Sequence, residues 1–141
     1  MGKGFEDLDV YKEARSFRKR VFKLTAMLPS QERHVLVSQM RRAALSITNN
    51  IAEGHGSRSF RHNVSYLYRA RGSVQEMQDD LNTCEDQGYF QKQHLEDLRE
   101  DSIRVAKLIN GYIRYLKSRM AEEKGIVTAD SPPKGAKQKT S

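Results

Sequence analysis

The chain has 141 residues, of which 37% are hydrophobic and 30% are charged, and its formal net charge is +7. This length can bury a hydrophobic core without help from disulfides or metal ions. The single cysteine, Cys84, excludes an intrachain disulfide and a cysteine zinc cluster. The excess of Lys and Arg favours an anionic partner, nucleic acid before a membrane surface, over a merely basic soluble protein.

The sequence carries no targeting signal that we recognise. No apolar run reaches the 18 or so residues that a membrane-spanning helix needs, and the first residues lack the apolar segment of a secretory signal. The cytoplasm is therefore the simplest location.

Residues 7–28 are predicted to form the first helix, because apolar side chains recur at alternating spacings of four and three residues along one face. These residues are Val10, Ala14, Phe17, Val21, Leu24 and Leu28. At about 100° per residue, four basic side chains fall on the opposite face. They are Lys12, Arg15, Lys19 and Lys23. Pro29 is expected to end this helix.

The second predicted helix spans residues 31–53 and is apolar or small on nearly all sides, so we expect more than one surface to cover it. One of these surfaces would be the core of the monomer, and another could be a second subunit. Leu45 points away from the apolar stripe of this helix. Gly54 follows it, and the absence of a Cβ there suits a left-handed C-terminal cap.

The third predicted helix covers residues 60–87, with Ser59 as its N-cap and Gly88 at its end. Gly72 lies in the middle of this helix, where it costs about 1 kcal/mol relative to alanine. We therefore expect a close contact between Gly72 and another backbone. The fourth predicted helix covers residues 92–123, and its opposite charges three or four residues apart are typical of a solvated face.

No segment shows the alternation of a strand, and the connections between helices are short. We therefore predict an all-α fold, an antiparallel up-down-up-down four-helix bundle over residues 1–124. Residues 125–141 have little apolar content and are predicted to be a disordered basic tail.

The leading candidates for function are the four basic residues on the outer face of the first helix, which we name the basic ridge. Residues 10–28 hold six basic side chains and one acidic one, Glu13. Like charges at this spacing repel and weaken a helix by roughly a few tenths of a kcal/mol per pair. Phosphate contacts would explain their presence, since each adds salt-dependent affinity; the alternative is an ordinary solvated face. The second-choice phosphate contacts are Arg18, Arg20, Arg58 and Arg61.

Aromatic residues of the third helix interleave with its basic residues. Phe60, Tyr66 and Tyr68 could stack on unpaired bases. Aromatic residues at helical spacing are, however, more often part of a core or an interface.

No catalytic, metal or cofactor site is predicted. The four histidines do not form a His-Glu-x-x-His motif, and no Cys–His cluster or glycine-rich phosphate loop is present. His55 and His62 could cleave RNA by acid–base catalysis, which leaves a small ribonuclease as a minor alternative.

Four motifs of the chain resemble one known family. They are Phe5-x-x-Leu8-x-Val10-Tyr11, then Leu28-Pro29-x-x-Glu32, then residues 39–54 with Gln39-x-Arg41-Arg42-Ala43 and Asn50-Ile51-Ala52-Glu53-Gly54, and finally Ala70-Arg71-Gly72-Ser73-x-x-Glu76. The family is that of the four-helix-bundle proteins encoded in intervening sequences of bacterial 23S rRNA genes. The resemblance covers about residues 5–120 and leaves the tail outside.

The resemblance implies a ring-like homopentamer of four-helix bundles. It also implies distant kinship with the accessory variability determinant of diversity-generating retroelements, a basic pentamer that binds nucleic acid and a reverse transcriptase. The polar positions of the family fall on Gln39, Arg42, Asn50, Glu53, Arg71 and Glu76. We interpret them as a structural network in which Glu53 or Glu76 pairs with Arg71.

Together these observations predict a non-enzymatic homo-oligomeric scaffold that binds nucleic acid, RNA first, through phosphate contacts. Its oligomer interface is expected at Tyr11, Phe22 and Leu45, which are large apolar residues off the core stripes. The alternative is a protein–protein adaptor, for a reverse transcriptase or another enzyme, with no direct role in nucleic-acid binding.

Overall fold

The computed structural model describes residues 4–125, and in this range four long helices and no strand are found. The helices are α1 (Asp9–Thr25), α2 (Ser38–His55), α3 (Phe60–Asp86) and α4 (Lys92–Glu123). Three short elements precede α1 and α2: the 3₁₀ turns η1 (Phe5–Asp7) and η2 (Ser30–Glu32) and the π-helical turn η3 (Arg33–Val37).

The bounds of the third and fourth helices agree with the sequence prediction, and those of the first two need correction. The predicted helix over 7–28 ends at Thr25, because the N–H groups of Met27 and Leu28 bond to carbonyls only three residues back. Pro29 disfavours helical backbone at the residue before it, which accounts for this tightened end. The predicted helix over 31–53 begins as a regular α-helix only at Ser38, after the two short turns.

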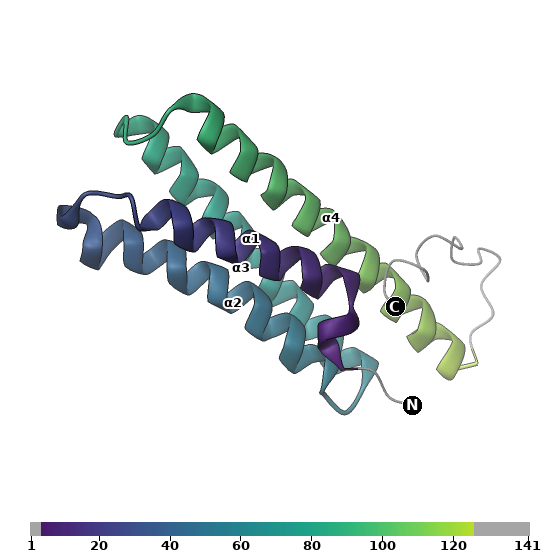
Figure 1. The fold of residues 1–141 in the computed structure, drawn as a ribbon. Helices are drawn as coiled ribbons and strands as arrows, with labels where there is room; N and C mark the ends of the chain where they lie inside the picture. The colour runs from purple at the N-terminus through teal and green to yellow at the C-terminus, as the bar shows by residue number, and fades with distance from the viewer. Residues whose placement is uncertain (1–3, 126–141) are drawn as a thin grey trace.

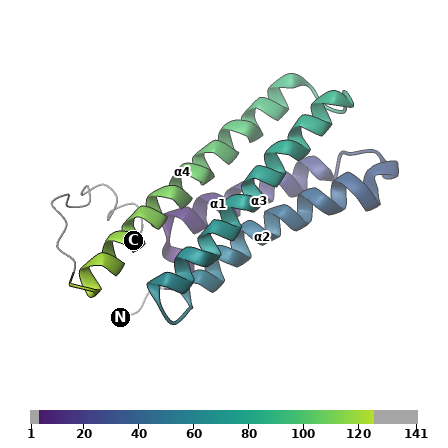
Figure 2. The same ribbon diagram turned by 180° about the vertical axis from the view of Figure 1, so that it is seen from behind.

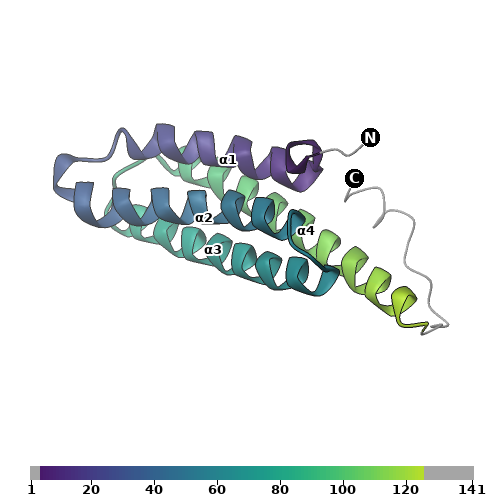
Figure 3. The same cartoon turned by 90° about the horizontal axis from the view of Figure 1, so that it is seen from below.

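Each helix packs against two others. α1 contacts α2 and α4, and α3 contacts the same two helices from the other side. The α1–α2 and α3–α4 connections lie at one end of the molecule, and the α2–α3 connection lies at the other end (Figures 1 and 2). The last turns of α4 extend beyond the α2–α3 connection (Figure 3).

The core is apolar and lies between the four helices. All six residues of the stripe predicted for the first helix are buried, which confirms its periodicity. Helix α2 is covered on two sides within the monomer: Ile47 and Ile51 are fully buried, and so, on the flank, are Ala44 and Thr48. The monomer itself therefore covers these residues, and a second subunit against α2 stays a prediction.

Two of the four glycine and capping predictions are confirmed. Ser59 accepts a hydrogen bond from the N–H of His62 at the start of α3. Gly88, with a φ of 68°, follows the end of α3 in the left-handed conformation that glycine tolerates.

The other two glycine predictions are wrong. Gly54 is not a left-handed cap but lies inside α2, where it allows close packing: a Cβ there would sit 2.6 Å from Asn63 Oδ1 and 3.0 Å from Tyr66 Cβ. Gly72 makes no close approach, since a Cβ there would meet nothing within 4 Å among the described residues.

Among residues 4–125 there is no helix long and apolar enough to cross a membrane. The predicted tail over residues 125–141 lies, apart from Gly125, outside the described residues.

Candidate nucleic-acid interface

The basic ridge forms as predicted on the outer side of α1. Its four side chains are exposed, and none takes part in an ion pair or hydrogen bond with the described residues. The first and the last of them are eleven positions apart in the sequence, which corresponds to about 16 Å along a helix. The ridge is therefore a row of exposed cations without a counter-charge among the described residues.

Two of the second-choice arginines are engaged by the protein itself. Arg18 Nη1 donates to Thr48 Oγ1 over 2.8 Å and ties α1 to α2. Arg20 Nε lies 3.2 Å from Asp101 Oδ2 on α4, and its Nη2 lies 3.7 Å from Glu13. These two arginines hold helices together, in contrast to the unpaired residues of the ridge.

Asp101 is the centre of a charged network that sequence reasoning missed. Its side chain is only 5% exposed and lies between Arg20 and Arg104, with Oδ1 of the carboxylate 2.5 Å from Arg104 Nη2. Arg104 also lies 3.4 Å from Glu13 on α1. The two guanidinium partners compensate for the burial of the Asp101 carboxylate. The network therefore holds α1 against α4.

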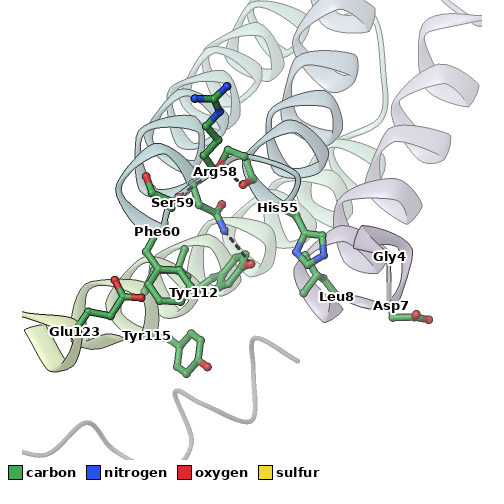
Figure 4. Close-up of a pocket in the computed structure, with 14 residues that line it drawn as sticks. Gly4, Asp7, Leu8, His55, Arg58, Ser59, Phe60, Tyr112, Tyr115 and Glu123 are labelled. Carbon is green, nitrogen blue, oxygen red and sulfur yellow. Dashed lines mark hydrogen bonds between the residues drawn. The ribbon is translucent and has the colours of Figure 1, made fainter. Parts of the chain in front are cut away.

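Arg58 and Arg61, the other second-choice contacts, are exposed; Arg58 lies in the α2–α3 connection and Arg61 in the first turn of α3. Arg58 lines a cavity of about 610 Å³ together with Leu8 of the N-terminal segment and Tyr112 of α4 (Figure 4). The structure thus places them at one end of the molecule, near the beginning of α1 but off the ridge itself.

The buried polar centre beside this cavity is a contact between α3 and α4. Asn63 Nδ2 donates to Tyr112 Oη over 3.1 Å, as the dashed line in Figure 4 shows. Asn63 Oδ1 is buried without a hydrogen-bond partner among the described residues. Burial of the Tyr112 hydroxyl raises its pKa above the ordinary value for tyrosine.

The histidines suggested for RNA cleavage lie on either side of the α2–α3 connection, and Ser59, the partner of His62, lines the same cavity as His55. His55 lines the cavity of Figure 4, whereas the His62 ring shares a 2.8 Å hydrogen bond between its Nδ1 and Ser59 Oγ. No group of three or more His, Cys, Asp or Glu side chains that could hold a metal ion is found within residues 4–125.

The polar positions that the resemblance marked are only partly brought together. Gln39, Arg42 and Glu76 line a cavity of about 370 Å³ between α2 and α3. Asn50 lies further along α2, where its Nδ2 donates to the carbonyl of Ser46. Both Glu53 and Arg71 are exposed.

The predicted partner of Arg71 needs correction. Arg71 Nη1 donates to Asn110 Oδ1 on α4 over 3.0 Å, and its guanidinium lies 4.9 Å from the centre of the Tyr68 ring. Its contacts are thus with α4 and with an aromatic ring rather than with Glu53 or Glu76. The helical phase of Arg71 could not reveal this, because its partner is 39 residues away in the sequence.

An acidic residue that the sequence analysis did not select lines the same α2–α3 cavity. Asp80 is 9% exposed, and burial, with the neighbouring carboxylates of Asp79 and Glu76 adding to it, raises the pKa of its carboxyl to about 6. The cavity therefore contains a carboxylate that is only weakly stabilised in its charged form.

The residues predicted for an oligomer interface differ in exposure. Tyr11 is buried, because the ring of Phe5 in η1 packs against it edge-on with the ring centres 4.8 Å apart. Phe22 is half-buried beneath the guanidinium of Arg41, which lies 4.8 Å from its ring centre. Leu45 is 41% exposed. Of the three, Leu45 alone presents a large apolar surface for an interface.

Comparison with known proteins gives a family match and matches to solved structures. The profile of a family described as 23S rRNA-intervening sequence protein matches residues 6–111. The chain is also similar to a crystal structure from Bacteroides thetaiotaomicron VPI-5482, described as a protein with unknown function from the S23 ribosomal protein family. That match has 25% sequence identity and a TM-score of 0.69, and it covers 74% of this chain and 97% of the other. No curated protein matches.

Proposed function

Because the chain belongs to the 23S rRNA-intervening sequence protein family, we propose that it is a non-enzymatic, homo-oligomeric helical scaffold that binds RNA through phosphate contacts. The basic ridge of α1 supplies the leading contacts, and Arg58 and Arg61 supply further ones at the α2–α3 end. The name of the family, which refers to an RNA gene, supports RNA as the first ligand to test.

The observation that carries this proposal is the contrast between neighbouring cations on α1. The four ridge residues are exposed and have no partner among residues 4–125, whereas Arg18 and Arg20 are held by Thr48 and Asp101. If all these charges served only solubility, we would not expect two of them to have protein partners while the four ridge residues have none. Free cations in a row retain their full attraction for phosphates, and release of counterions then drives binding.

The subunit is proposed to be an up-down-up-down bundle. Between α1 and α2, Arg18 pairs with Thr48 and Arg41 with Thr25, so the residue numbers run in opposite directions. The same holds between α3 and α4, where Asn63 bonds to Tyr112 and Gln78 to Ser102. These pairings support antiparallel neighbours.

The assembly is proposed to be a ring-like homopentamer. A ring would present several copies of the ridge to one RNA molecule, which raises the apparent affinity without any new contact. Leu45 is the residue whose exposure best suits the interface between subunits. Multi-angle light scattering tests this part of the proposal, since a pentamer has five times the mass of the chain.

A salt titration tests the RNA-binding mechanism. The variant Lys12→Gln/Arg15→Gln/Lys19→Gln/Lys23→Gln is compared with the wild type for binding to a labelled structured RNA at several salt concentrations. Each lost phosphate contact flattens the plot of log affinity against log salt by about 0.7–0.9. We expect the variant to lose a slope of about 3 in magnitude.

The matched control removes the same charge from other exposed positions, with Arg33, Lys92, Lys107 and Lys124 changed to Gln. We expect this control to keep most of the slope. Equal losses of slope in both variants would show that the ridge acts only through its general charge. Wild-type binding that does not depend on salt would contradict the phosphate mechanism. The same samples show whether the RNA stays intact, as a non-enzymatic scaffold requires.

A second candidate function, an adaptor that binds a protein such as a reverse transcriptase, is favoured by exposed apolar residues near the α1–α2 connection. Met27 is 61% exposed and Val35 is 57% exposed. The gene neighbourhood discriminates the two: a reverse-transcriptase gene beside a variable repeat would favour the retroelement accessory, and a position inside an rRNA gene would argue against it.

A further inference from the structure

Tyr68 of α3 is an exposed aromatic residue surrounded by cations. It is 38% exposed, and the guanidinium of Arg71 lies 4.9 Å from its ring centre. The ammonium of Lys117, on α4, lies 5.3 Å from the same centre. The ring of Tyr68 is therefore partly open to solvent and has a cation of α3 and a cation of α4 beside it.

Tyr68 and the residues beside it belong to two segments of the chain that contain no acidic residue. Residues 54–75 contain no Asp or Glu and four arginines, and residues 102–121 contain no Asp or Glu and five basic residues. Asn63 bonds to Tyr112, and Arg71 bonds to Asn110, so these two segments lie against each other.

The acidic residues of the same two helices lie towards the α3–α4 connection. Residues 76–86 hold five carboxylates and no Lys or Arg, and residues 96–101 hold four carboxylates and one arginine. The surface of α3 and α4 is therefore basic towards the α2–α3 connection and acidic towards the other end. Folding does not require this division, because surface charges contribute little to the stability of a bundle.

Arg114 completes the group around Tyr68. It lies four residues after Asn110, the partner of Arg71, and three residues before Lys117, so it shares their face of α4. It is exposed and has no hydrogen bond or ion pair with the described residues. We name Tyr68, Arg71, Arg114 and Lys117 the Tyr68 patch.

We infer that the Tyr68 patch binds single-stranded nucleic acid, with an unpaired base stacked on the Tyr68 ring and the flanking phosphates held by Arg114 and Lys117. An aromatic ring beside basic side chains is the combination that single-strand binding uses, because every base has a π-face and every linkage has a charge. Lys117 has a long, flexible side chain. When a base stacks on the Tyr68 ring, the ammonium of Lys117 moves from the ring to a phosphate. A duplex offers no free base face, so the ring adds nothing to duplex binding.

This inference goes beyond the proposed function and does not depend on the basic ridge. The ridge lies on α1, which packs mainly against α2 and α4, and it contains no aromatic residue. A second copy of the chain is a less suitable occupant in a two-fold contact, because two copies of this acid-free surface would repel each other.

The experiment compares Tyr68→Ala with Tyr68→Phe in the full chain, using a fluorescein-labelled 12-nucleotide oligo(U) and a duplex RNA of equal length. We expect Tyr68→Ala to weaken oligo(U) binding by about fivefold or more, since stacking contributes on that scale for each base. Tyr68→Phe keeps the ring and is expected to bind within about twofold of the wild type. Neither substitution is expected to change the affinity for the duplex.

A probe with one 2-aminopurine base reports stacking directly, because its fluorescence is quenched when it lies against an aromatic ring. We expect quenching with the wild type and Tyr68→Phe and none with Tyr68→Ala. Oligo(U) binding by Tyr68→Ala at wild-type strength, or equal losses for oligo(U) and duplex, would overturn the inference. A change in oligomer mass in Tyr68→Ala would also overturn it and would make the patch a subunit interface.

Two further variants separate this inference from the proposed function. Arg114→Gln/Lys117→Gln is expected to weaken oligo(U) binding and to flatten its salt dependence by about 1.4, the value for two single-strand phosphate contacts. The four-residue ridge variant is expected to retain base quenching at saturating protein. If the ridge variant alone lost RNA binding, the proposed function would stand and the Tyr68 patch would fail.

Discussion

Gly54 of α2 and Asn63 of α3 approach so closely that a Cβ on the glycine would sit 2.6 Å from Asn63 Oδ1 and 3.2 Å from the Asn63 carbonyl oxygen. Asn63 cannot move aside freely, because it is buried and its amide is bonded to Tyr112. The absence of one methyl group therefore sets the distance between two helices at this end of the bundle.

The substitution Gly54→Ala is expected to destabilise the protein by about 1–3 kcal/mol, since overpacking forces the buried neighbours to shift. Gly72→Ala is the matched control, because Gly72 is also inside a helix but a Cβ there would meet nothing. It is expected to stabilise by up to about 1 kcal/mol through helix propensity. Urea unfolding of both variants measures the difference, and equal effects would contradict the packing role of Gly54.

Tyr112→Phe removes the one hydrogen-bond partner found for the buried amide of Asn63. We expect a loss of stability of about 1–3 kcal/mol, the range for leaving a buried polar group unsatisfied. The control is Tyr115→Phe, whose hydroxyl accepts only from the half-buried Arg119. A Tyr112→Phe variant as stable as the wild type in urea would mean that water reaches Asn63.

Asp80→Asn tests the carboxylate in the α2–α3 cavity. Burial and the neighbouring acids raise the pKa of Asp80 from 3.8 to about 6, so the folded protein holds this proton more tightly than the unfolded chain. The stability of the folded protein therefore falls as the pH rises from about 4 to 6, and the full cost of the ionised Asp80 carboxylate is present at neutral pH. At pH 7 the variant is expected to be more stable than the wild type by about 1–3 kcal/mol.

At pH 4 the same substitution is expected to change stability little, because Asp80 is then mostly protonated in the folded state. Asp86→Asn, at the exposed end of α3, is the control and is expected to stay within about 0.5 kcal/mol of the wild type at both values of pH. A pH-independent effect of Asp80→Asn would show that charge is not the cause.

The sequence predicts helices well where apolar periodicity and local capping decide the structure. The fourth helix has the predicted bounds, and Ser59 and Gly88 mark the ends of α3 as expected. Apolar periodicity predicted the wrong helix bounds near Pro29, because the chain passes through two short turns there before the regular part of α2 begins. The role of Gly54 was also misjudged, because the deciding contact with Asn63 comes from another helix.

Only the part of the candidate site that lies on a single helix could be predicted from the sequence. The exposed ridge follows from helical phase alone, since solvent is its neighbour. The engagement of Arg20 could not be foreseen, because Asp101 lies 81 residues further along the chain and only tertiary packing brings the two together. Lys117 was missed for the same reason, although the acid-free run over 102–121 is visible in the sequence and was a usable signal.

Two adjacent residues, Lys19 and Arg20, separate the binding and structural roles of α1. Arg20→Gln removes one partner of the buried Asp101 carboxylate and is expected to cost about 1 kcal/mol of stability, with no change in the salt dependence of RNA binding. Lys19→Gln removes an unpaired ridge charge. It is expected to leave stability within about 0.5 kcal/mol of the wild type and to flatten the salt dependence by about 0.7–0.9. Urea unfolding and RNA titration of both variants would contradict this division of roles if the two substitutions had the same effects.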